Sequence, residues 1–429
     1  MVLLATEQPN SHGRERRVQR ADRAIAPRAG SRILLLGGDT DHNVGDRAIV
    51  TAVTQCIRSR DPAAEVSIIA DRGRGIPISG VSNSIPRGVR GTTALCRAAV
   101  AADRILIAGG GLFQDDDSRA KMPYWAARIL LLKSLNPRIA GHSLGAGPLQ
   151  HAESRLAARI ACAALTTVSV RDRYAHSALA TCTARHIEVV PDPAFMLEPA
   201  PPADAAALLR SLDLRPDRPL IVVAARRWFH ARGGFVPNVL KARAGMTVAG
   251  DTARLDGLLD ALSEALAQLG RRLDASILLL PSYNVAHEAD DAVCAALARR
   301  AANMTVRLAR IDDPRLYKAI LGRAMLVLSA RMHPLILGAG MGVPFVGLSY
   351  NSKFEGLFDL LGCAAQPLRL DDFPLLWGAR ELTAAAEAAL GTGGDLQHRA
   401  ALLGSTVRKR TLEAAFGDVA DPSLETADA

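Results

Sequence analysis

The strongest constraint in this sequence is a repeated alternation of short Ile/Val/Leu-rich runs with amphipathic Ala/Leu/Arg-rich stretches. The apolar runs end at Gly, Asp or Asn, as expected for buried parallel strands followed by the helices of βα units. In the first half we expect strands at 32–37, 65–70, 104–108, 138–143, 166–170 and 186–190, and helices near 46–59, 120–134, 151–164 and 173–180.

The same alternation restarts in the second half of the chain. There we expect strands at 219–225, 276–281, 304–309, 325–330 and 344–349, and helices near 251–269, 287–301, 314–323, 333–341 and 354–361. Loops at the carboxyl ends of parallel strands form the ligand sites of such sheets. The pattern therefore predicts an α/β protein with two Rossmann-like doubly wound domains that face each other across a cleft.

The domain boundaries follow from breaks in this pattern. Three prolines lie between 198 and 204, which predicts the join between the domains. We expect a basic, disordered leader at 1–30, a first domain at 31–203 on the acceptor side, a second domain at 204–378 on the donor side, and C-terminal helices and a tail at 379–429. Helices are expected near 380–391 and 395–416, one of them packing back across the first half. The long loop at 229–250 is a candidate lid over the cleft.

Charge favours anionic partners. The chain of 429 residues has a formal net charge of +9, which suits phosphorylated metabolites, nucleic acid or an acidic membrane face. Seven arginines between residues 14 and 32 would allow the leader to contact anionic lipid; a solvated tail is the alternative interpretation. The basic and aromatic residues are not interleaved as in nucleic-acid platforms, so no nucleic-acid partner is expected.

The six cysteines include no CxxC pair, and no Cys/His cluster has the spacing of a zinc site. We therefore expect neither a disulfide framework nor a metal. The first ten residues do not read as a signal peptide, and no apolar run reaches the ~18 residues of a spanning helix. The expected location is the cytoplasm, with contact at the inner face of the cell membrane through the leader.

A first candidate site follows the first expected strand, in the run from Gly37 to Asp46. Small residues let backbone N–H groups approach a ligand, and the start of the next helix favours an anion, so Asn43 and Asp46 are candidate substrate-binding residues. The alternative is a tight turn in which Asp46 caps the helix. The run is neither a P-loop nor a GxGxxG motif, and no GxSxG elbow occurs in the chain.

A second candidate site is the triple glycine at 109–111 with Gln114 and the aspartates 115–117. Three residues without a β-carbon at a strand end suit close contact with a substrate, and we take Gly110, Gly111 and Gln114 as substrate-binding residues. The carboxylates are acceptors for sugar hydroxyls or for Mg²⁺, or are simply solvated at a helix start.

A third candidate site lies where strand 325–330 ends. Arg331 can hold a phosphate or carboxylate, and His333 beside it can donate a proton. Lys353 adds a cation after the next strand. Further charged residues follow other strands: Arg226 and Arg227, Arg171 with Asp172 (a buried ion pair is the alternative), and Asp192, which also fits a turn.

Eight motifs recur here in a familiar order: Asn43-x-Gly45-Asp46, Gly109-Gly110-Gly111-Leu112-Phe113-Gln114-Asp115, Gly145-x-Gly147-Pro148, Ser169-Val170-Arg171-Asp172, Asp192-Pro193, Arg226-x-Trp228, Arg331-x-His333 and Tyr350-x-x-Lys353. Together they resemble the polysaccharide pyruvyl transferases, over about residues 35 to 365. The resemblance implies a glycosyltransferase-B-like pair of domains that moves the enolpyruvyl group of phosphoenolpyruvate onto a sugar of a polysaccharide or its lipid-linked precursor, forming a pyruvate ketal and releasing phosphate.

The resemblance also implies roles for particular residues. Arg331, His333 and Arg226 would bind the donor, with Arg227 as an alternative to Arg226, and Asp115 would lie near the acceptor. His142 stands where an amide-bearing residue is expected, which predicts an altered acceptor preference.

The chemistry of the residues agrees with this. Phosphoenolpyruvate carries two anionic groups, which Arg226, Arg331 and Lys353 can meet, with Arg171 as a further substrate-binding residue. Protonation of its methylene carbon needs a general acid, for which His333 is the candidate, and Asp115 is the candidate base for the sugar hydroxyl. No cofactor is required. The alternatives are a nucleotide-sugar-dependent glycosyltransferase of the same fold, or a non-catalytic component of a polysaccharide assembly complex.

Overall fold

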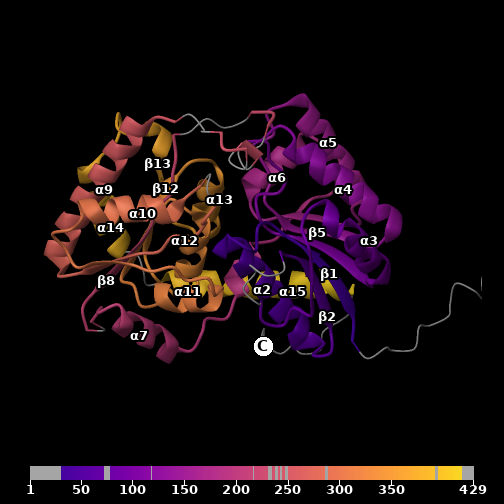
Figure 1. Ribbon diagram of the computed structural model, residues 1–429, viewed down its shortest axis with the longest axis horizontal. Coiled ribbons are helices and arrows are strands. Elements are labelled where there is room, and N and C mark those ends of the chain that lie inside the picture. The colour runs from indigo at the N-terminus through magenta and orange to yellow at the C-terminus, as the bar shows by residue number, and fades with distance from the viewer. Residues whose placement is uncertain are drawn as a thin grey trace, which may run out of the picture.

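The structure is a computed structural model that describes residues 30–71, 78–116, 118–215, 217–229, 234–236, 240–241, 244–246, 250–285, 288–391 and 395–417. The expected leader, apart from Gly30, and the tail from 418 lie outside the described residues. Two α/β lobes lie side by side in Figure 1, each built on a parallel sheet. The prediction of two doubly wound α/β domains is confirmed.

The first domain contains a seven-stranded sheet in the order β3-β2-β1-β4-β5-β6-β7. Its strands are β1 (Arg32–Leu36), β2 (Glu65–Ile69), β3 (Asn83–Ile85), β4 (Arg104–Ala108), β5 (Ile139–Leu144), β6 (Val168–Val170) and β7 (Glu188–Val189). Its helices are α2 (Val44–Arg60), α3 (Thr92–Ala101), α4 (Lys121–Leu135), α5 (Ala152–Ala164) and α6 (Arg173–Ala180), with the 3-10 turns η1 (Val89–Gly91) and η2 (Pro193–Met196). The strand order reverses between β1 and β4, so the loops after these two strands open a crevice.

The second domain contains a six-stranded sheet in the order β10-β9-β8-β11-β12-β13. Its strands are β8 (Leu220–Ala224), β9 (Ser276–Leu279), β10 (Val306–Leu308), β11 (Leu326–Ser329), β12 (Phe345–Ser349) and β13 (Leu368–Arg369). Its helices are α7 (Pro202–Ser211), α9 (Thr252–Leu273), α10 (Asp290–Arg300), α11 (Pro314–Leu321), α12 (Met332–Ala339), α13 (Lys353–Leu360) and α14 (Ala379–Leu390), with the turn η3 (Leu370–Asp372). Here the order reverses between β8 and β11, the strands that precede Arg226 and Arg331.

The local sequence explains these elements. Every residue of β8, LIVVA, is buried, because the strand is covered on both faces and can be apolar throughout. In α9 the leucines 258, 262, 266 and 269 recur at helical spacing and face the core. The side chain of Asp251 caps this helix by accepting from the backbone N–H of Arg254 at 2.9 Å.

The last helix, α15 (Leu396–Phe416), returns to the first domain. It packs against α2, η2 and the strands β4 and β5, and in Figure 1 it is the yellow helix that runs across the lower part of the molecule. An apolar cluster continues from α2 through α11 and α12 to α15, so the two domains share a core beneath the cleft. This shared core fixes how the two crevices face each other.

Several elements were not expected from the sequence. Strand β3 has three residues and β13 has two, which is too short to show a period. Helix α3 buries only Leu95 and Ala99, so its pattern is faint. Within the described part of the chain, no helix is long and apolar enough to cross a bilayer.

Candidate active site

A cavity of about 330 Å³ lies where the two crevices face each other. Small-molecule sites commonly have volumes of ~300–1,000 Å³. Its wall carries seven cationic side chains and four carboxylates besides His333: Arg87, Lys121, Arg128, Arg171, Arg226, Arg331 and Lys353, with Asp39, Asp46, Asp116 and Glu288. The cationic excess on the wall favours an anionic ligand.

Backbone contacts close one edge of the cleft. Asn43 of the first domain and Tyr283 of the second form an antiparallel β-bridge, and the N–H of Val44 donates to the carbonyl of Ser282 at 3.0 Å. The hydroxyl of Tyr283 also donates to Asp39 Oδ2 at 3.3 Å. The loop after β1 is therefore tied directly to the second domain.

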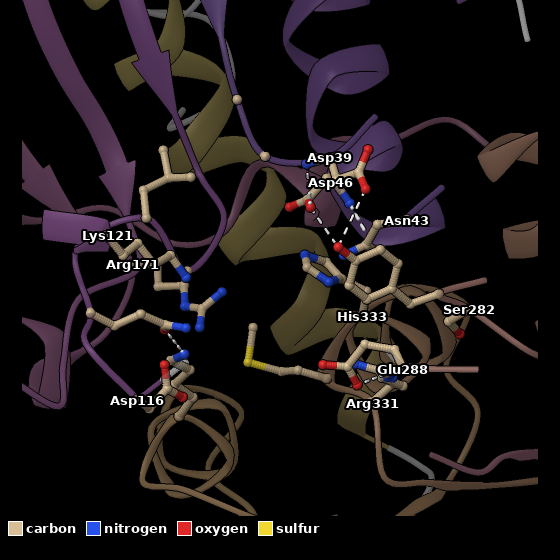
Figure 2. Close-up of a pocket in the computed structure, with 18 of the residues that line it drawn as sticks. Asp39, Asn43, Asp46, Asp116, Lys121, Arg171, Ser282, Glu288, Arg331 and His333 are labelled. Atoms are coloured by element: carbon tan, nitrogen blue, oxygen red, sulfur yellow. Dashed lines mark hydrogen bonds and ion pairs between the residues drawn. The ribbon is translucent and has the colours of Figure 1, made fainter. Parts of the chain in front are cut away.

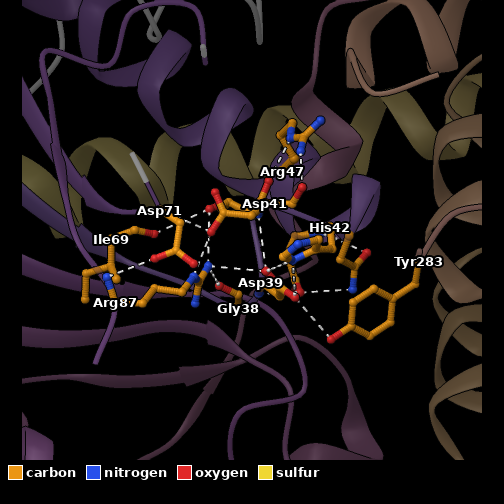
Figure 3. Close-up of polar contacts among 12 residues, drawn as sticks. Gly38, Asp39, Asp41, His42, Arg47, Ile69, Asp71, Arg87 and Tyr283 are labelled. Carbon is orange, nitrogen blue, oxygen red and sulfur yellow. Dashed lines mark hydrogen bonds and ion pairs between the residues drawn. The ribbon is translucent and has the colours of Figure 1, made fainter. Parts of the chain in front are cut away.

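Two arginines, the buried Arg47 and the half-buried Arg87, hold this loop in place (Figure 3). Arg47, which is 1% exposed, donates to the carbonyl oxygens of Thr40 and Asp41, both at 2.8 Å. Arg87 donates to Asp41 Oδ2 at 2.8 Å and lies 3.5 Å from Asp39 Oδ1. These contacts to its carbonyl and carboxylate oxygens hold the loop in place beside the cavity.

Asn43, rather than Asp46, caps α2. Its Oδ1 accepts from the backbone N–H of Gly45 at 2.9 Å, and its Nδ2 donates to Asp46 Oδ2 at 3.0 Å. Asp46 instead accepts from the N–H of Asp39 at 2.8 Å, and burial raises the pKa of the Asp46 carboxyl. A carboxyl with a raised pKa beside a histidine suits proton transfer.

His333 lies in the first turn of α12 and projects into the cavity between carboxylates of the other domain (Figure 2). Its Nε2 is 3.7 Å from Asp192 Oδ2. The positive charge of a protonated His333 acts on Asp46 as well. A β-carbon on Gly45 would lie 2.1 Å from Nδ1 of His333, so the glycine of the Asn43-x-Gly45-Asp46 motif makes room for this imidazole.

Asp192 also contacts Arg171. Its Oδ2 is 3.4 Å from Nη1 of Arg171, whose Nε is 3.4 Å from Asp172 Oδ2. Burial acts to raise the pKa of Asp192, but the contacts with His333 and Arg171 hold that pKa below its usual value. Arg171 is thus a buried ion-pair member, as the alternative reading stated, and it also lines the cavity.

Arg226 and Arg331 share one carboxylate. Glu288 Oε2 accepts from Nη2 of Arg226 at 2.8 Å and from Nη2 of Arg331 at 2.9 Å, and Asp290 accepts from Nε of Arg331 at 2.9 Å. Burial acts to lower the pKa of Arg331, but the charges of Asp290 and Glu288 raise it overall. The two carboxylates position the guanidinium groups and offset part of their charge.

Lys353 reaches across the cleft from the start of α13. Its Nζ donates to Gln114 Oε1 of the first domain, and burial lowers the pKa of the ammonium group. Gly111 lines the cavity beside this contact. A β-carbon at this position would lie 2.6 Å from Gln114 Oε1 and 3.1 Å from the ammonium nitrogen, so a side chain here would crowd the contact. Behind them, the guanidinium of Arg226 stacks 4.1 Å from the ring centre of Tyr350.

The structure does not bring Asp115 to the cavity. Its carboxylate is buried and accepts from the backbone N–H groups of Gln150 and His151, at 3.1 and 2.9 Å, and contacts His151 Nδ1 at 3.0 Å. These hydrogen bonds lower the pKa of Asp115 although burial acts to raise it. The next residue, Asp116, lines the cavity, and its buried Oδ1 has no hydrogen-bond partner among the described residues.

Two glycines of the triple run pack on protein atoms instead of facing a ligand. A β-carbon on Gly109 would lie 2.6 Å from Ile49, and one on Gly110 would lie 3.0 Å from Asp46 Oδ1. Gly110 therefore does not line the cavity and serves to admit the Asp46 carboxylate. Of the three glycines, Gly111 lines the cavity, and the predicted contact with substrate stays a prediction.

His142 also lies away from the cavity. It is 2% exposed, and its Nε2 is 2.8 Å from the hydroxyl of Thr411 on α15. No contact of His142 with the cavity supports the prediction that this position changes acceptor preference.

The expected lid at 229–250 is described only in part, because residues 230–233, 237–239, 242–243 and 247–249 lie outside the described residues. Within the described part, the carbonyl of Phe235 accepts from the hydroxyl of Ser118 at 2.9 Å.

Sequence reasoning missed Glu288 and Asp290, and also Arg87, Lys121 and Arg128. The acidic pair precedes a helix and reads as ordinary helix-start charge. The three cations come from the region after β3 and from α4, where no strand-end pattern marks them. In the part of the chain that the structure describes, no group of three or more His, Cys, Asp or Glu side chains could hold a metal ion.

The two Rossmann-like domains that face each other across a cavity have the glycosyltransferase-B fold. Three solved structures show the likeness: a Listeria monocytogenes protein described as a UDP-N-acetylglucosamine 2-epimerase (TM-score 0.54, 13% identity, 90% of this chain and 96% of that chain), a Rickettsia africae glycosyltransferase (0.53, 11%, 90% and 98%) and the Neisseria meningitidis UDP-GlcNAc 2-epimerase (0.51, 10%, 89% and 99%). At these identities the likeness concerns the fold alone.

The sequence narrows this class further. The model of the polysaccharide pyruvyl transferase family matches residues 43–352, so the chain belongs to that family. No curated protein sequence matches the chain. The family resemblance inferred from the eight motifs is thereby confirmed.

Proposed function

We propose that this protein transfers the enolpyruvyl group of phosphoenolpyruvate to two hydroxyls of a saccharide, which forms a pyruvate ketal and releases phosphate. The observation that carries the proposal is the imidazole of His333, held in a cation-lined cavity between Asp46 and Asp192 of the facing domain. Family membership supports pyruvyl transfer, and the chemistry of the cavity supports this donor.

The donor carries a phosphate and a carboxylate. Lys353 and the first turn of α12 offer donors for one anionic group, since no side chain caps that turn and Met332 and His333 face the cavity. Arg226 and Arg331 line the cavity with guanidinium groups that Glu288 and Asp290 hold in place, and a guanidinium group can bind a carboxylate or phosphate. This arrangement needs no cofactor, because the donor itself supplies the activated carbon.

His333 is the proposed general acid. Protonation of the methylene carbon of phosphoenolpyruvate makes the neighbouring carbon electrophilic, and the first sugar hydroxyl attacks it. The second hydroxyl then displaces phosphate. A carboxylate must accept the proton of the attacking hydroxyl, and Asp116 replaces Asp115 in this role, since Asp116 lines the cavity and its Oδ1 has no hydrogen-bond partner among the described residues.

The test is direct. The protein is incubated with phosphoenolpyruvate and a panel of mono- and oligosaccharide acceptors, and phosphate release and the mass of the ketal product are measured. His333→Ala should lower turnover by at least about 100-fold, while the exposed His186→Ala changes it little.

A parallel thermal-shift experiment separates this proposal from nucleotide-sugar transfer. Stabilisation by phosphoenolpyruvate is expected, since only the native state binds it. Stabilisation by nucleoside diphosphates alone, with no ketal formed on any acceptor, would overturn the proposal. We further propose that the reaction occurs in the cytoplasm, with a saccharide or lipid-linked saccharide as acceptor and contact with the inner face of the membrane.

A further inference from the structure

The first-domain wall of the cavity carries an aromatic and cationic surface that the proposed donor chemistry leaves unused. Lys121, Tyr124, Trp125 and Arg128 all line the cavity from α4. Their spacing of three and four residues places them on one face of the helix. Tyr124 is 56% exposed, so this surface extends from the cavity toward its mouth.

Among the described residues, Arg128 has no carboxylate partner. Its Nη1 donates to the hydroxyl of Tyr124 at 2.5 Å, and its guanidinium carbon lies 5.7 Å from the ring centres of both Tyr124 and Trp125. None of the carboxylates in the described residues forms an ion pair with it, and its buried Nε has no hydrogen-bond partner there. Arg171, Arg226 and Arg331, by contrast, each pair with a carboxylate.

An unpaired guanidinium of this kind is costly. Burial lowers the pKa of Arg128, and the positive charge of Arg87 acts in the same direction. A cation that is partly desolvated, aligned by an aromatic hydroxyl and left with unused N–H donors matches a phosphate, which accepts hydrogen bonds from two guanidinium nitrogens at once. The adjacent rings offer the flat apolar surface on which a sugar ring packs.

We propose that Arg128, Tyr124 and Trp125 form an acceptor subsite that binds a phosphate attached to the acceptor saccharide. This inference rests on the proposed function and narrows its substrate class: the acceptor is a saccharide phosphate, whether free or joined through its phosphate to a carrier, and not a neutral polysaccharide. The subsite belongs to the first domain, whereas Lys353, Arg226 and Arg331 of the second domain face the donor.

Matched acceptors test the subsite. A panel of hexose 1-phosphates and the corresponding methyl glycosides is assayed with phosphoenolpyruvate. For the wild type we expect a KM at least about tenfold lower for the phosphates. Arg128→Gln should raise the KM for the hexose 1-phosphates by about tenfold or more and leave the KM for phosphoenolpyruvate and for the methyl glycosides within about twofold. Arg128→Lys, which keeps the positive charge, should raise the KM for the hexose 1-phosphates less than Arg128→Gln does. Arg159→Gln, an exposed arginine on α5, is the control.

Equal KM values for phosphates and methyl glycosides in the wild type, or an unchanged KM in Arg128→Gln, would overturn the subsite. A binding titration without donor, followed by tryptophan fluorescence, separates the two proposals. Weaker binding of hexose 1-phosphate to Arg128→Gln with no turnover on any acceptor supports the subsite and removes the pyruvyl transfer. Absence of hexose 1-phosphate binding to the wild type in both assays removes the subsite. The same titration compares a sugar phosphate joined to a carrier with the free sugar phosphate. Tighter binding of the carrier-joined form would identify it as the acceptor.

Discussion

The imidazole of His333 and the carboxylate of Asp192 meet across the boundary between the two domains, with Nε2 3.7 Å from Oδ2. His333 comes from the first turn of α12 in the second domain, and Asp192 precedes η2 in the first. The proposed general acid is thus oriented by a carboxylate that it meets only when the domains are packed together. We assign Asp192 as a positioning residue for His333.

Asp192→Asn tests that assignment. Asparagine keeps the oxygen that accepts from the N–H of Ala194 at 3.0 Å, so η2 remains capped. The negative charge beside the ring is lost, and Asp46 remains as the other carboxylate near it. We expect kcat to fall by about tenfold or more, with the KM for phosphoenolpyruvate within about twofold of the wild type. Asp172→Asn, which contacts Arg171 but not His333, should keep the kcat of the wild type; equal kcat values in all three proteins contradict the assignment.

Gly45→Ala should disable the site without unfolding α2. The added β-carbon would lie 2.1 Å from Nδ1 of His333, so the imidazole must move, and misplacement of about 1 Å costs roughly 100-fold in kcat. Circular dichroism and a melting curve check the fold. Gly257→Ala on α9, whose new β-carbon meets its first neighbour at 3.7 Å, is the control and should keep full activity. Retained activity in Gly45→Ala would show that the ring position is not required.

Asp115→Ala should lower the stability of the fold, whereas Asp116→Ala should lower catalytic activity. Asp115 accepts two backbone N–H groups and contacts His151, so its loss should lower the free energy of unfolding by about 1–3 kcal/mol with turnover preserved below the transition. Asp116 has an unpartnered oxygen at the cavity, so its loss should leave stability unchanged and lower kcat by about 100-fold. Denaturant titration and steady-state kinetics measure both. The reverse pattern would return the base to Asp115.

His142 makes the fold sensitive to acid. Burial lowers the pKa of His142 to about 4, against about 6.5 in the unfolded chain. Below pH ~6.5 the unfolded state binds more protons, so stability falls as the pH drops toward 4, by up to about 3 kcal/mol. The hydroxyl of Thr411 donates its hydrogen to the carbonyl of Val407, so its oxygen accepts from the Nε2–H group of His142. The side-chain amide of a glutamine at position 142 can donate the same hydrogen bond.

His142→Gln should therefore flatten the pH dependence of the free energy of unfolding between pH 7.5 and 4.5, measured by urea titration. The exposed His186→Gln should retain the slope of the wild type. If His142→Gln loses stability with acid as steeply as the wild type, another group is responsible.

The position of each candidate site in the fold could be predicted because it depends on local pattern. Apolar runs identify β1, β4, β8 and β11, and in doubly wound sheets their carboxyl ends meet at the crevice. That reasoning placed Asn43, Gln114, Arg226 and Arg331 around one cavity. It also placed His333 there, since the residue follows β11 by only a few positions.

Side-chain direction and partners could not be predicted in the same way. Asp115 and Asp116 are neighbours, and only the path of the loop after β4 decides which one faces the cavity. Glu288 is separated from Arg226 by 62 residues, so nothing local links them. The glycines were assigned to ligand contact, but Gly45 leaves space for His333 of the other domain and Gly110 leaves space for Asp46 of its own domain. Both roles depend on contacts between segments far apart in the sequence.

One helix, α15, contacts both domains. Near its start, Arg399 donates to the carbonyl oxygens of Leu361 and Gly362 in the second domain, at 2.9 and 2.7 Å. Farther along, the hydroxyl of Thr411 lies 2.8 Å from Nε2 of His142 in the first domain. Because a single unbroken helix carries both sets of contacts, the relative position of the two domains on this side of the cavity depends on one rigid element.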